Sequence, residues 1–254
     1  MNADAIKKFI TTEGQLTWTM TTNGYKFYTL NLVVWLRDIA KVPWKLLIVC
    51  CDAESLSFFR REGFPCVSYK AETQKGQIRI SDFGSDAFAK WNLKKLEIFK
   101  WLCTESETLG LRESLYVDGD IVIQKDPWPV LKDVEGSLAF QCDCSHTEDH
   151  LDCQAVCTGF VLCRHGKFNL DLFTVVKEDW IPADTDQGYI RKRLGTLGIP
   201  FRTLNRHQFG NGPWQKSGIW KTEPNAWVML HYNYRVGDTK KAAMKADGHW
   251  KIPY

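Results

Sequence analysis

The sequence predicts an α/β fold with a mixed, mostly parallel central sheet and helices on both faces. Three observations support this class. Residues 15–69 alternate strand, helix, strand, helix and strand, which is typical of parallel sheets covered by helices. Apolar runs recur at 115–123, 137–141 and 158–163, as in strands that are buried on both faces. The length of 254 residues is sufficient for one large core, so residues 1–254 are expected to form a single domain.

Composition is that of an ordinary globular protein, with 44% hydrophobic and 25% charged residues. The net charge of +3 is spread along the chain, which argues against a nucleic-acid surface. Eleven tryptophans favour carbohydrate as a ligand, because sugar rings stack on exposed aromatic faces. No apolar run reaches the roughly 18 residues of a transmembrane helix, and the first residues lack a signal-peptide pattern. The nine cysteines form no regular framework, so we expect a cytoplasmic protein in a reducing compartment.

The first 70 residues supply the alternating part of the sheet. The expected elements are a short helix at 4–10, strands at 15–20, 44–51 and 66–69, and helices at 25–39 and 55–62. Ligands of such a sheet bind beyond the carboxyl ends of its strands. The polar residues at those ends are Thr21, Thr22, Asn23 and Asp52. They are candidates to hold a nucleoside, although the Thr-Asn-Gly turn could equally cap the following helix.

Residues 70–102 combine a polar stretch with a regular helical pattern. We expect a surface loop over 70–86 and a helix over 87–102. Lys94 and Lys95 lie near the middle of this helix, where one of them could reach a phosphate. The alternative is that both are solvated, as most helix lysines are.

The segment Asp118-Gly119-Asp120 interrupts a buried strand and is the most informative part of the chain. Two ionised carboxylates in this position repel each other and need a countercharge. A divalent cation supplies one, and oxygen ligands suit Mg²⁺ or Mn²⁺. Gly119 lets the backbone turn and leaves room for a ligand to approach. The alternatives are a solvated hairpin turn and a phosphatase-type nucleophile at Asp118, although the latter is expected near the start of its domain.

A run of cysteines and histidines follows the strand at 137–141. Its members are Cys142, Cys144, His146, His150, Cys153 and Cys157. Four of them could hold a structural Zn²⁺. The alternative is a group of buried cysteines that bind nothing, because no Cys-x2-Cys pair occurs.

The remaining elements complete the α/β pattern. They are a helix over 168–180, a helix over 189–194 opened by Asp184–Gly188, strands at 200–204 and 227–231, and a glycine-rich turn at 209–214. The last strand delivers His231, which matters for function only if it returns to the Asp118/Asp120 pair as a third metal ligand. Asp186 and Gln187 stand at a helix N-terminus, where capping is the simpler explanation.

These motifs together resemble the nucleotide-diphospho-sugar transferases of the Rossmann-like GT-A fold. The similarity is greatest to the metal-dependent family of plant xylosyl- and arabinosyltransferases, and more distant to the glycogenin and galactosyltransferase group. It covers residues 15–251. The matching segments are Thr21–Gly24, Asn31, Asp52, Lys95, Tyr116–Val122, Asp126–Pro127, Thr158–Phe160, Asp186–Gln187, Phe209–Gly212, and His231–Asn233 with Gly237 and Lys241. One Asp-x-Asp pair is weak evidence, whereas this ordered series is specific.

The resemblance implies a Mn²⁺- or Mg²⁺-dependent transfer of a sugar, with retention of configuration, from a UDP-sugar donor to a glycan or glycoconjugate acceptor. Residues 1–115 would bind the nucleotide, and residues 116–254 would bind metal, sugar and acceptor. Asp120 and His231 would ligate the metal, and Asp118 would ligate it or hold the ribose.

The resemblance also implies roles for other residues in the same site. Those that would seat the nucleoside and diphosphate are Thr21, Thr22, Asn23, Asp52, Lys95 and Gly119. Asn211 and Gly212 would line the sugar and acceptor side. Lys241, or its neighbour Lys240, would contact the departing diphosphate, and Asp186 and Gln187 would position the sugar.

Two other function classes remain open at this point. A phosphohydrolase with Asp118 as nucleophile would cleave simple phosphate esters with Mg²⁺, and a non-catalytic protein of the same fold would bind nucleotide or sugar without turnover. The chain lacks the membrane anchor of many eukaryotic family members, so a bacterial or viral cytosolic enzyme is expected rather than a Golgi one.

Overall fold

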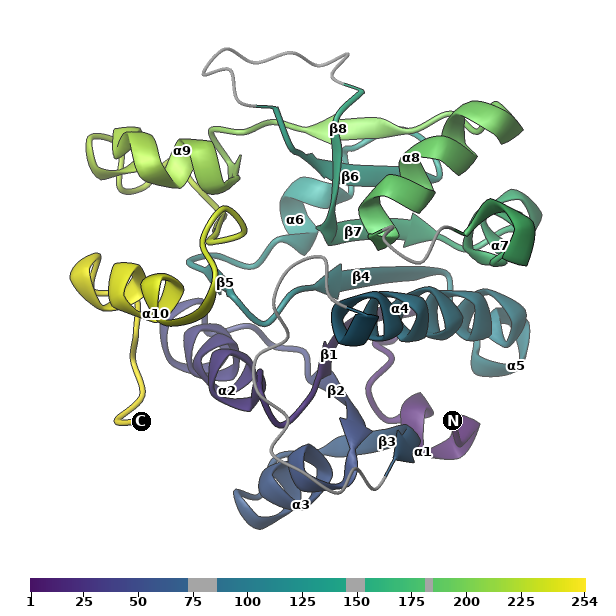
Figure 1. Cartoon of the computed structure of the whole chain (residues 1–254), viewed down its shortest axis with the longest axis horizontal. Coiled ribbons are helices and arrows are strands. Elements are labelled where there is room, and N and C mark those ends of the chain that lie inside the picture. Colours follow the sequence, from purple (N-terminus) through teal and green to yellow (C-terminus); the bar gives the residue numbers. More distant parts are fainter. Residues whose placement is uncertain (73–85, 145–153, 181–184) are drawn as a thin grey trace.

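The centre of the molecule is a seven-stranded sheet in the order β3-β2-β1-β4-β7-β6-β8 (Figure 1). The computed structural model describes residues 1–72, 86–144, 154–180 and 185–254. The strands of this sheet are β1 (Gln15–Thr21), β2 (Leu46–Asp52), β3 (Cys66–Glu72), β4 (Glu113–Val117), β6 (Leu138–Cys142), β7 (Val156–Arg164) and β8 (Arg202–Leu204). β7 runs antiparallel to β4 and β6, and the other neighbouring pairs are parallel. The predicted mixed, mostly parallel sheet is confirmed.

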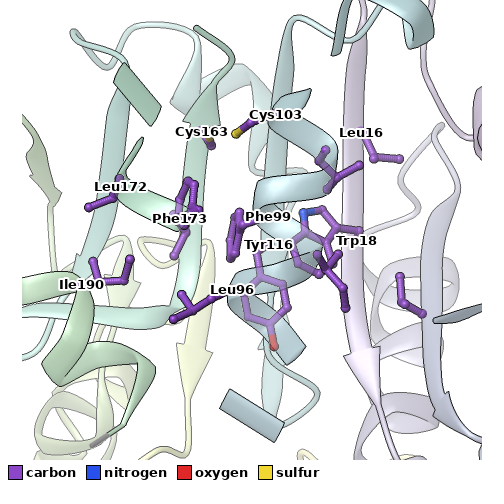
Figure 2. Close-up of a cluster of buried hydrophobic side chains, with 14 of the residues drawn as sticks. Leu16, Trp18, Leu96, Phe99, Cys103, Tyr116, Cys163, Leu172, Phe173 and Ile190 are labelled. Carbon is purple, nitrogen blue, oxygen red and sulfur yellow. The ribbon is translucent and has the colours of Figure 1, made fainter. Parts of the chain in front are cut away.

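Helices cover both faces of this sheet. Against one face pack α1 (Ala3–Lys7), α4 (Asp86–Thr104), α7 (Lys167–Phe173) and α8 (Asp186–Leu197). Against the other pack α2 (Lys26–Val34), α3 (Ala53–Arg61) and α6 (Trp128–Leu131). Alternate side chains of β2 pack into the two hydrophobic cores, with Leu47 on the first face of the sheet and Ile48 on the second. Figure 2 shows the first core, where Phe99 of α4 stacks on Phe173 of α7 at 4.4 Å between ring centroids.

A second, three-stranded sheet, which the sequence did not predict, lies beside the first. It consists of β5 (Ile121–Ile123), β10 (Met229–His231) and β9 (Phe209–Gly210), in the order β5-β10-β9. β10 runs antiparallel to β5, with His231 opposite Ile121. Since β5 begins directly after Asp120, this pairing brings the late histidine to the Asp-Gly-Asp segment.

The remaining elements are short. They are α5 (Ser106–Leu109), α9 (Gly212–Ser217), α10 (Gly237–Ala246), a π-helical turn at Trp35–Ile39 and 3₁₀ turns at Lys177–Asp179 and Ile219–Lys221. Two predictions are corrected here. The helix expected over 168–180 ends at Phe173, and the turn expected over 209–214 contains β9 and the start of α9. The Asn211 side chain accepts a hydrogen bond from the Trp214 amide at 3.1 Å, so it caps α9.

The C-terminal segment is held by buried polar groups. The Asn31 amide donates to the carbonyl of His249 at 3.0 Å, and the Trp35 indole donates to the same carbonyl at 2.8 Å. The His249 ring lies against aromatic residues and is 2.7 Å from the Tyr232 hydroxyl. Burial lowers the pKa of His249 to about 4. His249 is therefore neutral in the folded protein at neutral pH.

Arg164, at the end of β7, ties a turn of the chain to the sheet. Its guanidinium pairs with Glu113 at 2.6 Å and donates to the carbonyls of Leu131, Val134 and Gly136 at 3.1, 2.5 and 2.5 Å. Removing this partly buried charge would take a donor from all four acceptors, of which Glu113 keeps Gln15 and the Leu131 carbonyl keeps the Val134 amide.

Candidate functional site

The functional site lies at the carboxyl end of β4, where the chain leaves the large sheet for the small one. The cleft there has a volume of about 690 Å³. Its lining includes Thr21, Thr22, Lys95, Asp118, Gly119, Asp120, Gly159, Asp186, Gln187, His231 and Lys240. Asp118 is fixed by its backbone, because its amide donates to the carbonyl of Gly159 at 2.7 Å. The sheet topology thus gathers residues that are more than 200 positions apart in the sequence.

Asp118, Asp120 and His231 form the one group of possible metal ligands in this cleft that the described residues offer. Their ligand atoms all lie within 4.8 Å of one another. Nε2 of His231 is 3.2 Å from Asp120 Oδ1 and 3.8 Å from Asp118 Oδ2. Asp120 and His231 are almost fully buried, and Asp118 is partly open to the cleft. Two carboxylates and an imidazole are a donor set that suits Mn²⁺ or Mg²⁺.

His231 is oriented by Gln141 of β6. The Gln141 amide nitrogen donates to the carbonyl of Gly210 at 2.8 Å, so its oxygen faces His231 Nδ1 at 2.7 Å. An Nδ1–H that donates to this oxygen leaves Nε2 toward the two aspartates. Burial acts to lower the pKa of His231, but the Asp120 carboxylate outweighs it and raises the pKa to about 10. The Asp120 carboxylate therefore favours a positive charge beside Nε2, which a proton or a metal ion would supply.

Two glycines leave the space that this arrangement requires. A Cβ on Gly159 would lie 2.2 Å from His231 Cε1 and 2.6 Å from Asp118 Oδ2. A Cβ on Gly119 would lie 2.8 Å from Thr29 Oγ1. A side chain at position 159 would thus fill the cradle between the ligands, so the pocket fits a metal ion only because this residue is glycine.

Two buried lysines balance the carboxylates. Lys240 of α10 contacts Asp120 Oδ2 and donates to the Tyr25 hydroxyl at 3.2 Å. Lys95 of α4 lies 2.5 Å from Asp186 and 3.7 Å from Asp118. Burial acts to lower the pKa of each lysine, but the adjacent carboxylates outweigh it and hold both pKa values above the usual range. Both side chains are therefore fixed cations in the cleft wall.

The two adjacent lysines of α10 differ in position. Lys240 is buried, whereas the Lys241 ammonium lies over the Trp250 ring, 5.0 Å from its centroid. Lys241 is not part of the cleft lining. Residues four positions apart lie on one face of a helix, so Lys240 shares a face with the buried Met244. This spacing distinguishes Lys240 from Lys241 in the sequence.

Two of the residues predicted to bind the nucleoside make hydrogen bonds within the protein and do not line the cleft. The Asp52 carboxylate caps α3 by accepting from the Ser55 amide at 2.7 Å, and it accepts from the Asn23 amide at 2.7 Å. The Asn23 side chain accepts from Lys26 at 2.7 Å. Asp52 is fully buried, and neither it nor Asn23 lines the cleft. Thr21 and Thr22 do line it.

The opposite wall contains a polar network centred on Asp143, a residue that the sequence did not single out. Its carboxylate accepts from Gln187 at 2.8 Å and from Asn233 at 3.1 Å. Burial raises its pKa. Asp143 follows directly after β6, and a polar residue at a strand end is the sequence feature that could have identified it. Asn233 in turn accepts from the Gly212 amide at 2.8 Å, so Gly212 supports this wall without lining it.

The predicted zinc cluster is only partly within the described residues, because His146, His150 and Cys153 lie outside them. Cys144 is disulfide-bonded, so its sulfur is not free to bind zinc. Cys157 is buried, with its sulfur 3.7 Å from His231 Nδ1. In the described parts of the chain, no helix is both long and apolar enough to cross a membrane.

Comparison with known proteins gives the family. The model of the nucleotide-diphospho-sugar transferase family matches residues 44–244, whereas the comparison with curated protein sequences gives no match. Among solved structures, the glycosyltransferase GlyE of Streptococcus pneumoniae is similar, with a TM-score of 0.53 and 12% identity over 93% of this chain and 60% of GlyE. The galactosyltransferase LgtC is similar with a TM-score of 0.52 and 13% identity, over 93% of this chain and 97% of LgtC.

These two likenesses concern the fold, since the identities are low. The chain spans about three fifths of GlyE and nearly all of LgtC. The family match covers most of the chain and agrees with the family that the ordered motifs predict. This protein therefore belongs to the nucleotide-diphospho-sugar transferase family and has the GT-A fold of glycosyltransferases.

Proposed function

We propose that the protein transfers a sugar from a UDP-sugar to a hydroxyl of a glycan or glycoconjugate, with Mn²⁺ or Mg²⁺ and with retention of configuration. The observation that carries this proposal is the Asp118, Asp120 and His231 group, whose ligand atoms lie within 4.8 Å of one another in the cleft. The family supports a nucleotide-sugar donor. The family also favours sugar transfer over a phosphohydrolase with Asp118 as nucleophile.

The residues in and beside the proposed metal site have different roles. Asp118, Asp120 and His231 would hold the cation, which when bound neutralises charge on the diphosphate oxygens. Lys240 adds a second positive charge whose place is set by Asp120 and Tyr25. A pre-oriented cation at the wall stabilises charge that grows on the leaving diphosphate. We assign this role to Lys240 and not to Lys241, because only Lys240 lines the cleft.

Asp186 and Gln187 are proposed to position the donor sugar. Asp186 is paired with Lys95 at 2.5 Å, and Gln187 is held by Asp143 at 2.8 Å. A carboxylate neutralised by an adjacent lysine is a weak nucleophile. This pairing favours front-face attack, with the departing phosphate as base, over a covalent intermediate on Asp186.

The acceptor is proposed to enter beside Tyr234 and Val236. Both residues line the cleft, and their exposed fractions are 44% and 60%. Exposed aromatic rings are favourable surfaces for sugar stacking. In the same scheme, residues 1–115 supply the nucleotide wall through Thr21, Thr22 and Lys95, and residues 116–254 supply the metal, sugar and acceptor sides.

A thermal-shift screen tests this proposal. UDP and a panel of UDP-sugars are added with and without Mn²⁺, and hydrolysis of each UDP-sugar is followed in parallel. A ligand at a hundred times its Kd should raise Tm by roughly 5–10 °C, and only when Mn²⁺ is present. Asp120→Asn should abolish the shift, whereas the exposed Asp133→Asn should retain it. A metal-independent shift, or an unchanged shift in Asp120→Asn, would overturn the metal site.

A further inference from the structure

A second group of possible metal ligands lies away from the cleft, within the first hydrophobic core. It consists of Cys103 at the end of α4, Cys163 on β7 and His165 just beyond β7, and we call it the Cys2His cluster. The three ligand atoms lie within 4.8 Å of one another. Both cysteines are free and buried, with exposed fractions of 8% and 0%. Figure 2 shows the two cysteines adjacent at one end of the core.

The polar atoms of this cluster have few partners outside it. Among the described residues, both ring nitrogens of His165 are buried and have no hydrogen-bond partner outside the cluster. The hydroxyl of the fully buried Ser114 also has none in that part of the chain. Ser114 is paired with Cys163 across β4 and β7, so the hydroxyl and the thiol lie on the same face of the sheet. Unpaired buried donors and acceptors are costly, and a bound ion would satisfy the imidazole.

We propose that the Cys2His cluster binds one Zn²⁺ through the two sulfurs and an imidazole nitrogen, with water in the fourth position. Tetrahedral zinc with Zn–S of about 2.3 Å and Zn–N of about 2.0 Å needs ligand separations of about 3.6–3.8 Å. Side-chain rotations that move these atoms by about 1 Å meet this requirement, since they already lie within 4.8 Å. The Asn169 amide, 3.5 Å from Cys163 Sγ, donates toward the sulfur and stabilises a thiolate. Binding releases the thiol protons.

The ion would connect two elements that also form the cleft. Cys103 follows Lys95 along α4 by about 12 Å, and Cys163 follows Gly159 along β7 by about 13 Å. The Cys2His cluster is thus remote from the Asp118/Asp120 pair. Zinc there would raise stability by joining α4 to β7 and would leave Mn²⁺ binding in the cleft unchanged.

Cobalt serves as the spectroscopic probe, because thiolate-bound Co²⁺ absorbs strongly in the near ultraviolet. The full chain, purified without exposure to air and saturated with Mn²⁺, is titrated with Co²⁺ and then with Zn²⁺. We expect one Co²⁺ per chain with a thiolate band that Zn²⁺ removes. Zn²⁺ should also raise Tm by roughly 5–10 °C at a hundred times its Kd. No thiolate band, or a disulfide between Cys103 and Cys163 in the protein as purified without exposure to air, would overturn the proposal.

Variants assign the band to the Cys2His cluster. Cys103→Ser should abolish it, and His165→Gln, at a half-buried position, should weaken Co²⁺ affinity 10- to 100-fold. The half-buried Cys66→Ser is the matched control. Cys157→Ser is a second control, because Cys157 is the thiol beside His231 in the cleft. A band that survives in both Cys103→Ser and His165→Gln, or is lost in Cys157→Ser, would refute the assignment.

Discussion

Adding one methyl group at Gly159 should damage the metal site more than the fold. The new Cβ would lie 2.2 Å from His231 Cε1 and 2.6 Å from Asp118 Oδ2. Ordinary contacts need more than 3.4 Å, so a ligand must move by about 1 Å. His231 cannot move freely, because Gln141 holds its Nδ1 at 2.7 Å. Overpacking a buried site in this way costs about 1–3 kcal/mol, which corresponds to a Tm lower by roughly 2–12 °C.

The functional cost of Gly159→Ala should be larger. A displacement of about 1 Å in a reacting geometry lowers turnover on the order of 100-fold. Mn²⁺ binding is measured by the loss of the free-ion electron paramagnetic resonance signal, and turnover by release of UDP. Gly195→Ala is the control, since Gly195 lies in α8 with nothing within 4 Å of a new Cβ. It should stabilise the helix by roughly 0.5–1 kcal/mol and leave Mn²⁺ affinity unchanged. A folded Gly159→Ala protein with native Mn²⁺ affinity and turnover would refute the geometry.

Three further predictions concern separate parts of the chain. Lys240→Met should lower turnover 100- to 1000-fold, because it removes the cation beside Asp120, whereas Lys241→Met should change it less than about threefold; equal effects would contradict the assignment. The pKa of His249 is about 4 in the folded protein and 6.5 in the unfolded chain. Below pH 6.5 the unfolded chain therefore binds the proton first, and the unfolding free energy falls as the pH decreases toward 4. Chemical denaturation at pH 8 and pH 5 should show a loss of roughly 2 kcal/mol that His249→Gln lacks; the same slope in both proteins would exclude His249 as its source. Arg164→Met should lower the unfolding free energy by about 2–4 kcal/mol, since Glu113 loses its cation and the carbonyls of Val134 and Gly136 lose the guanidinium donor, and an unchanged denaturation midpoint would contradict this.

Much of the fold follows from local sequence patterns. The strands at Gln15–Thr21, Leu46–Asp52 and Val156–Arg164 are long, β-branched and apolar, so local propensity and burial agree. The small sheet was missed because β5, β9 and β10 have only two or three residues each. Pairing between such distant short segments depends on tertiary packing and leaves no periodic signal. The helix predicted to reach residue 180 ends at Phe173 instead, so local patterns also predict the ends of elements poorly.

The three possible metal ligands were predictable from the sequence, whereas several other charged residues in and near the site were not. Asp118, Asp120 and His231 do come together, as the sequence hypothesis requires. Asp52 does not join the site, because both of its carboxylate oxygens accept hydrogen bonds from backbone amides. A carboxylate at a strand end can cap the next helix or bind a ligand, and sequence alone does not separate these uses. The Asp143 network depends on contacts between β6, α8 and the segment after β10, which no local pattern encodes.

The ligation of the metal by His231 is the claim on which the proposed chemistry depends most directly. Electron spin echo measurements on the protein loaded with Mn²⁺ and UDP detect an imidazole nitrogen bound to the ion. We expect a directly coordinated nitrogen in the native protein and its loss in His231→Gln, with Mn²⁺ still bound more weakly by the aspartates. A native spectrum without nitrogen coupling, or one that His231→Gln leaves unchanged, would contradict it.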